Sequence, residues 1–159
     1  MKRAIQVILV LAAALAVLSL AAWGAAVWFL GPRILWAPEG VQVAAEAPSA
    51  AAVGDPLELT IRIRNDGPAT RVLETIEIET DYLEGFSADS IEPPPESSEQ
   101  VLQYRVYRMD TPVPAGQTTP IRFDLRALTP GAFAGRVQVT FEGEPRIAFS
   151  TVNTTVAPR

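Results

Sequence analysis

The chain has 159 residues, enough for about one ordinary domain, and it contains neither cysteine nor histidine. The missing thiols exclude disulfides, thiolate metal sites and cysteine nucleophiles, and the missing imidazoles remove the commonest general base and metal ligand. The net charge of −5 argues against nucleic acid as a partner.

The first predicted element is a membrane-spanning helix. Residues 4–30 hold no charged side chain, and a helix of that length measures about 40 Å, against a hydrocarbon core of about 30 Å. Lys2 and Arg3 precede this stretch. The positive-inside rule therefore places residues 1–3 in the cytoplasm and the chain after the helix outside it, in the periplasm or at the cell surface. Trp28 and Trp36 are the expected anchors at the membrane interface.

A cleaved signal peptide is the alternative interpretation of this segment. Ser19–Ala21 and Gly24–Ala26 both fit the small-x-small pattern of a cleavage site. Cleavage after Ala21 would leave residues 22–30 as a free apolar tail, so a retained signal anchor is favoured.

Small residues recur four positions apart along the predicted helix. This spacing lets two helix backbones approach closely, which predicts contact with another membrane helix. An alanine-rich helix also produces such pairs by chance, so both interpretations stay open. The positions are Ala12, Ala16, Ala21, Ala22, Ala25 and Ala26.

The remainder of the chain divides into three parts. Gly31-Pro32 is a natural helix stop, so residues 31–40 are predicted to form a juxtamembrane linker. From residue 41 the period of the apolar residues changes to two, which is typical of half-buried strands. This pattern predicts an extracytoplasmic domain over residues 41–156 and a short tail over residues 157–159.

About seven strands are expected in this domain. The clearest covers residues 57–63, where apolar and polar residues alternate strictly between two turns. The others are expected near residues 41–45, 71–80, 101–109, 121–127, 137–141 and 146–156.

Side-chain directions follow from the same alternation. It predicts that Val72 points inward in one strand and that Ile147 and Phe149 point inward in the last strand, with a bulge before Val152. The proline-rich stretch 92–99 is predicted to be a loop, because proline cannot donate to a strand ladder.

The predicted fold class is all-β, an immunoglobulin-like antiparallel β-sandwich of about seven strands, preceded by one transmembrane α-helix. Val53–Gly67 resembles the second-strand signature of bacterial immunoglobulin-like domains of the cell-adhesion-related (CARDB) type, with a glycine turn, an alternating strand and Asn-x-Gly. Val113–Gln117, followed by a strand, is also similar. The resemblance implies an extracytoplasmic sandwich used for adhesion, spacing or assembly, and it implies no catalytic residues.

One acidic cluster is a candidate metal site. Glu77, Glu79 and Asp81 share one face of a predicted strand, and clustered carboxylates are the oxygen ligands that Ca²⁺ takes. The alternative is a solvated face balanced by neighbouring arginines, and no Asp-x-Asp-x-Asp loop supports a metal.

A second candidate is a protein contact at residues 104–108. Tyr104, Arg105, Tyr107 and Arg108 are of the types favoured in interfaces, and whichever tyrosine faces outward is the expected anchor. The alternative is one core tyrosine among ordinary surface arginines.

No sequence motif of an enzyme occurs. Gly-x-Ser-x-Gly, phosphate-loop and dinucleotide patterns are missing from the sequence, so we expect no enzymatic activity, no cofactor and no small-molecule ligand. The predicted function is that of a membrane-anchored, non-catalytic interaction domain, an accessory or structural subunit whose partners are the lipid bilayer and other membrane protein subunits. A surface-displayed adhesion or ligand-binding module is the alternative.

Overall fold

The computed structural model describes residues 37–159, and the structural statements below concern those residues. The predicted membrane helix over residues 4–30, its alanine pairs, and Trp28 and Trp36 lie outside them. Within residues 37–159, no helix combines the length and apolar character needed to cross a bilayer.

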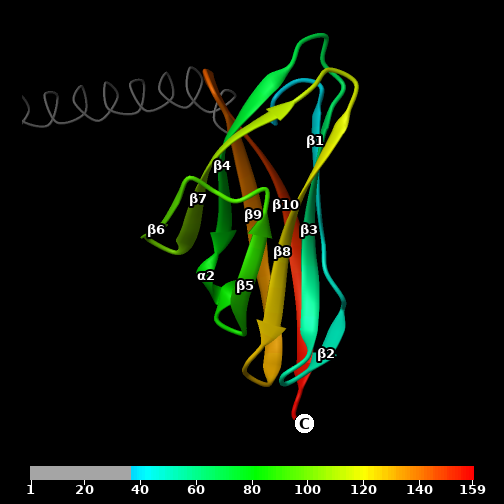
Figure 1. Cartoon of the computed structure of the whole chain (residues 1–159), viewed down its shortest axis with the longest axis vertical. Helices are drawn as coiled ribbons and strands as arrows, with labels where there is room; N and C mark the ends of the chain where they lie inside the picture. Colours follow the sequence, from blue (N-terminus) through cyan, green and yellow to red (C-terminus); the bar gives the residue numbers. More distant parts are fainter. Residues whose placement is uncertain (1–36) are drawn as a thin grey trace, which may run out of the picture. The chain divides into compact units, whose positions relative to one another are not determined.

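Two β-sheets pack face to face in this domain (Figure 1). The first sheet has the strand order β1-β3-β8-β5, and the second has the order β2-β10-β9-β4-β7-β6. The short strand β2 runs parallel to β10, and the other strand pairs described are antiparallel. The elements are β1 (Val41–Glu46), β2 (Ala50–Ala52), β3 (Pro56–Asn65), β4 (Arg71–Glu79), α2 (Thr80–Leu83), β5 (Phe86–Glu92), β6 (Ser97–Val101), β7 (Tyr104–Val113), β8 (Thr118–Ala127), β9 (Gly131–Phe141) and β10 (Glu144–Ala157).

All seven expected strands are present, and the structure adds β2, β5 and β6. These three carry few buried apolar side chains, so they give little period-two signal in the sequence. The all-β sandwich is therefore confirmed, with more strands than the alternation predicted.

The core lies between the two sheets, and the strict alternation of β3 builds one side of it. Leu59 and Ile61 of β3 are fully buried and pair with Phe123 and Ile121 of β8. From the opposite sheet the ring of Tyr107 meets Phe123 edge-on, with 5.1 Å between the ring centroids and 72° between the planes. This aromatic pair joins the two layers.

Two β-bulges change the side-chain directions that the sequence predicted. In β4 the register shifts between Leu73 and Thr75, and Leu73 is fully buried in place of Val72. In β10 the shift precedes Ala148, so Ala148 points inward and Phe149 points outward. The predictions for Val72, Ile147 and Phe149 were wrong, because an extra residue reverses which face each later side chain occupies.

The residues that lead into β1 are fixed to the domain. Pro38 is buried, and its carbonyl accepts a hydrogen bond of 3.2 Å from the Val41 N–H. The carbonyl of Gly40 accepts a bond of 2.6 Å from the Asp66 N–H. Gly40 has φ +71°, and a Cβ there would lie 3.0 Å from the nitrogen of Gly67, so glycine suits this close approach. We call residues 37–40 the leading turn.

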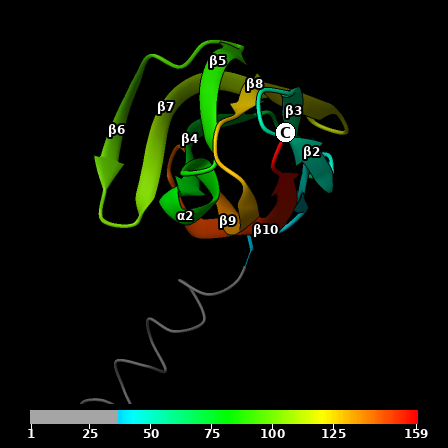
Figure 2. The ribbon, with the colours of Figure 1, turned by 90° about the horizontal axis from the view of Figure 1, so that it is seen from below.

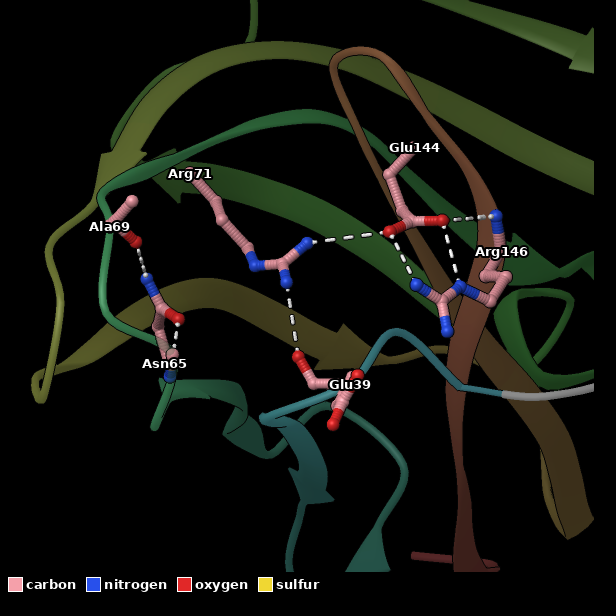
Figure 3. A network of polar contacts seen from close by, with 7 residues as sticks. Glu39, Asn65, Ala69, Arg71, Glu144 and Arg146 are labelled. Atoms are coloured by element: carbon pink, nitrogen blue, oxygen red, sulfur yellow. Dashed lines mark hydrogen bonds and ion pairs between the residues drawn. The ribbon is translucent and has the colours of Figure 1, made fainter.

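Arg71 ties the leading turn to the start of β10 (Figure 3). Its Nη2 donates to the carbonyl of Glu39 at 3.0 Å, and its Nη1 lies 3.6 Å from Oε2 of Glu144. Glu144 also accepts from Nε and Nη2 of Arg146, at 2.9 and 3.1 Å. The hydrogen bond from Arg146, followed by further charge attraction from Arg146 and Arg71, holds the pKa of Glu144 below its usual value.

Glu144→Gln is expected to make the stability of the domain less dependent on pH. Because the folded-state pKa of Glu144 is lowered, its stabilisation is present above the unfolded pKa of about 4.3 and is lost as the pH falls through the folded value. At pH 7 the variant should lose up to about 1 kcal/mol, and the difference from wild type should shrink steadily as the pH falls below the unfolded pKa. Thermal unfolding across this pH range measures it.

Glu142→Gln is the matched control, since Glu142 is an exposed acid in the same hairpin and forms no ion pair with a described residue. Its stability difference from wild type should stay within about 0.5 kcal/mol at both pH values. An equal loss in the two variants at pH 7 would contradict a specific role for Glu144.

Asn65, at the end of β3, bonds to the β3–β4 loop and to β7, and Figure 3 shows its bond to Ala69. Its Nδ2 donates to the carbonyl of Ala69 at 2.8 Å and to that of Val113 at 2.9 Å, and its Oδ1 accepts from the Gly67 N–H at 3.0 Å. The side chain is fully buried. Asn65 therefore fixes the β3–β4 loop against the end of β7.

Candidate interaction surface

Strand β7 carries Tyr104–Arg108, the segment predicted to contact a partner. The alternation along β7 turns Tyr107 into the core and leaves Tyr104 and Arg108 on the outer face of the six-stranded sheet. Arg105 is half-buried on the same side of the strand as Tyr107. Tyr104 is thus the tyrosine that a partner can reach, while its role in binding stays a prediction.

Hydrogen bonds hold Tyr104 on this outer face. Its hydroxyl donates to Oε1 of Glu79 at 3.2 Å and accepts from Nε2 of Gln138 at 2.9 Å. The second carboxylate oxygen of Glu79 accepts from the backbone N–H of Arg136 at 2.8 Å. Partial burial, together with the negative charge of Glu79, raises the pKa of Tyr104, so its hydroxyl stays protonated at neutral pH.

Phe149 lies exposed on the same face, because the bulge in β10 turns it away from the core. Its side chain is 56% exposed, and the guanidinium carbon of Arg136 lies 5.2 Å from the centre of its ring. Phe149 pairs with Gln138 across the sheet. We call Tyr104, Arg136, Gln138 and Phe149 the outer patch, and it combines the aromatic and arginine side chains that are enriched in protein interfaces.

A shallow hollow adjoins the outer patch. Its volume of about 300 Å³ is at the lower end of the range for small-molecule pockets, and it is open to solvent. Gly135 lies between this hollow and α2, where a Cβ would be only 2.7 Å from Cβ of Tyr82. The hollow is lined by Glu79, Ala134, Gly135, Arg136, Thr151, Val152 and Asn153.

The structure does not bring the three candidate Ca²⁺ ligands together. Both carboxylate oxygens of Glu79 already accept hydrogen bonds, Glu77 lies 3.4 Å from the hydroxyl of Thr75, and Asp81 is exposed in α2. Among residues 37–159, no three acidic side chains are placed to hold a metal ion.

The sequence interpretation missed the β6–β7 hairpin, because stretch 92–99 was predicted to be a loop. Ser97–Val101 is instead a strand that pairs with β7. Its tip exposes two apolar side chains, Val101 at 45% and Leu102 at 84%. No alternation marks this strand in the sequence, since its five residues are all exposed.

Comparisons with known proteins identify the fold. No protein-family model matches the sequence, and no curated protein is similar to it. Among solved structures, the chain is similar to the cohesin module of a family 33 glycoside hydrolase from Clostridium perfringens, with a TM-score of 0.50 and 12% identity over 75% of this chain and 98% of that chain.

Two further solved structures have comparable scores. The sporulation control protein Spo0M from Bacillus subtilis gives a TM-score of 0.50 with 12% identity, over 77% of this chain and 51% of that chain. A CARDB domain from Pyrococcus furiosus gives a TM-score of 0.48 with 11% identity, over 75% of this chain and 94% of that chain. At 12% identity the likeness to the cohesin module and to Spo0M is one of fold alone, and it agrees with the β-sandwich expected from the sequence.

Proposed function

We propose that this chain is a membrane-anchored, extracytoplasmic interaction domain that acts as an accessory or structural subunit of a membrane protein complex. The outer patch supports an interaction role, because it places aromatic and arginine side chains on an open sheet face. Every buried side-chain polar atom of the described domain has a hydrogen-bond partner, so no unpaired buried group points to a catalytic centre there.

The observation that carries the proposal is the fixed leading turn. The predicted membrane helix ends at residue 30, and Pro38 is already buried in the domain. The seven intervening residues extend at most about 25 Å, since a fully extended chain spans about 3.3–3.6 Å per residue. A tether of this length would keep the leading end of the sandwich close to the bilayer, where neighbouring membrane subunits lie.

The location is tested by labelling single cysteines, since the natural chain has none. Thr129→Cys, in the exposed turn after β8, should react with a membrane-impermeant maleimide in intact cells. A cysteine in a short tag before residue 1 should react only after lysis. The opposite pattern would contradict the orientation, and loss of the tag from the mature protein would indicate signal-peptide cleavage.

The subunit role is tested by solubilising native membranes in mild detergent and measuring the native size of the particle that contains this chain. We expect a particle substantially larger than the chain in its micelle, with other membrane proteins co-purifying. A single monomeric species would contradict the accessory role and favour a surface-displayed binding module.

A further inference from the structure

Three of the four edge strands of the sandwich are protected against pairing with another strand. Strand β2 has only three residues. Strand β1 is tied to β10 by a hydrogen bond of 3.0 Å from the Ala45 N–H to Oγ of Ser150. Strand β5 carries a bulge between Ala88 and Ser90. Short length, covering contacts and bulges are the usual ways in which proteins block edge pairing.

Strand β6 has none of these features. It pairs with β7 over five consecutive residues without a shift of register, and it contains no proline or lysine. All five residues are exposed. Figure 2 shows β6 at the edge of the sheet, with β7 as its neighbouring strand. In an antiparallel ladder, alternate residues of an edge strand turn their N–H and C=O groups away from the neighbouring strand. Those groups of β6 meet no other strand of the described domain.

The tip of the hairpin has an unusual conformation for its residue type. Leu102 has φ +54° and is 84% exposed. Left-handed backbone costs an ordinary L-residue about 1–2 kcal/mol, and two-residue hairpins favour Gly or Asn at such positions. Residues held in rarely populated conformations cluster at ligand clamps and other functional sites. An apolar side chain is thus displayed at the end of an open strand edge, next to Val101.

The nearest basic residues, Arg105 and Arg108, lie on β7, on the side of β6 that faces away from its free edge. Glu96 comes directly before β6, and the one charged residue of the strand itself is Glu99. Its ion pair with Arg108 of β7 is long, at 3.4 Å, and both side chains are about half exposed. If two copies of β6 paired antiparallel about their centres, Glu99 would face Glu99, and like charges directly opposite each other are destabilising. A basic strand would instead meet complementary charge.

We propose that the free edge of β6 binds an extended, basic segment of a partner protein by β-strand addition. A lysine or arginine of that segment faces Glu99, and an apolar side chain contacts Val101 and Leu102. This names the contact through which the proposed interaction role would act, and so it rests on that role. Its test involves neither membrane location nor complex membership, so the two proposals fail separately.

The test uses the purified full chain in mild detergent, a condition that does not depend on membrane insertion, and a blocked nine-residue peptide of alternating arginine and valine. Hydrogen–deuterium exchange should slow within residues 97–101 when the peptide binds, because its backbone would satisfy the free edge. Glu99→Arg should weaken binding at least about tenfold, since it places like charges together. Glu142→Arg makes the same charge change away from β6 and should leave the affinity within about twofold of wild type.

Leu102→Asn distinguishes the contribution of the Leu102 side chain to binding from its contribution to the stability of the hairpin. Asparagine accepts positive φ, so the hairpin should keep its thermal stability while peptide binding weakens. Three results would overturn the proposal. One is peptide binding without protection of residues 97–101, or no binding at all. The second is equal binding of a peptide of alternating glutamate and valine. The third is concentration-dependent protection of β6 in the chain alone, which would identify a second copy as the occupant.

Discussion

Replacing Phe123 with alanine is expected to lower the free energy of unfolding of the domain by about 3–5 kcal/mol. The phenyl ring is fully buried in β8 and contacts the ring of Tyr107 across the two sheets. Its loss removes a large apolar side chain, an aromatic pair and the packing that joins the layers. Urea unfolding of the full chain, followed by the β-sheet circular dichroism signal, measures the change.

Phe149→Ala is the matched control because it removes the same side chain from the solvent face of β10. We expect a loss within about 0.5 kcal/mol, as is usual for surface positions, together with loss of the Arg136 contact. The two substitutions also test the bulge in β10. Equal losses at the two sites would mean that Phe149 points inward, as the sequence alternation alone predicts.

Asn65→Ala is expected to cost about 2–4 kcal/mol, a large effect for a polar residue. The substitution leaves the carbonyls of Ala69 and Val113 and the N–H of Gly67 without their side-chain partner, and each unsatisfied buried group costs about 1–3 kcal/mol. The expected loss of stability is smaller than the sum of these three costs, because water can reach part of the loop. The same unfolding measurement applies.

Asp66→Ala, at the next residue, is the control for this loop. Asp66 is exposed and accepts bonds from Arg64 at 2.7 Å and Gln42 at 3.1 Å. Such surface contacts contribute at most about 1 kcal/mol. If Asp66→Ala destabilised the domain as much as Asn65→Ala, the loop rather than the buried amide would account for the effect.

The sequence predicts most of the sandwich because alternation reports burial directly. The alternating apolar residues of β3 and β8 are buried, and so are Val137, Val139 and Phe141 of β9. Asn65 occupies the next inward-facing position of β3 after Ile63. A polar residue at a core position of the sequence pattern indicates a buried group that needs hydrogen-bond partners. The bonding partners of Asn65 lie in the β3–β4 loop and at the end of β7, and only the folded chain brings these two segments together.

The bulges, the short strands and the site itself are less accessible from sequence. The shift of apolar parity predicts a bulge in the last strand but places it after Phe149, whereas the register shift lies before Ala148, so Phe149 faces outward. The segment at residues 104–108 was singled out from residue types alone, and the strand parity then decides that Tyr104 and not Tyr107 faces outward. Strand β6 is defined by backbone pairing, which leaves no trace in the pattern of apolar residues.

The described domain also has a mechanical property. Its first strand begins at the leading turn, and its last strand finishes at the opposite end of the long axis (Figure 1). Tension applied between those ends runs along the strands, at right angles to the hydrogen bonds of the ladders. The six residue pairs that join β1 to β3 would then be loaded in shear and resist together. A sandwich pulled in this way would transmit tension from one end to the other with little extension until the strands separate.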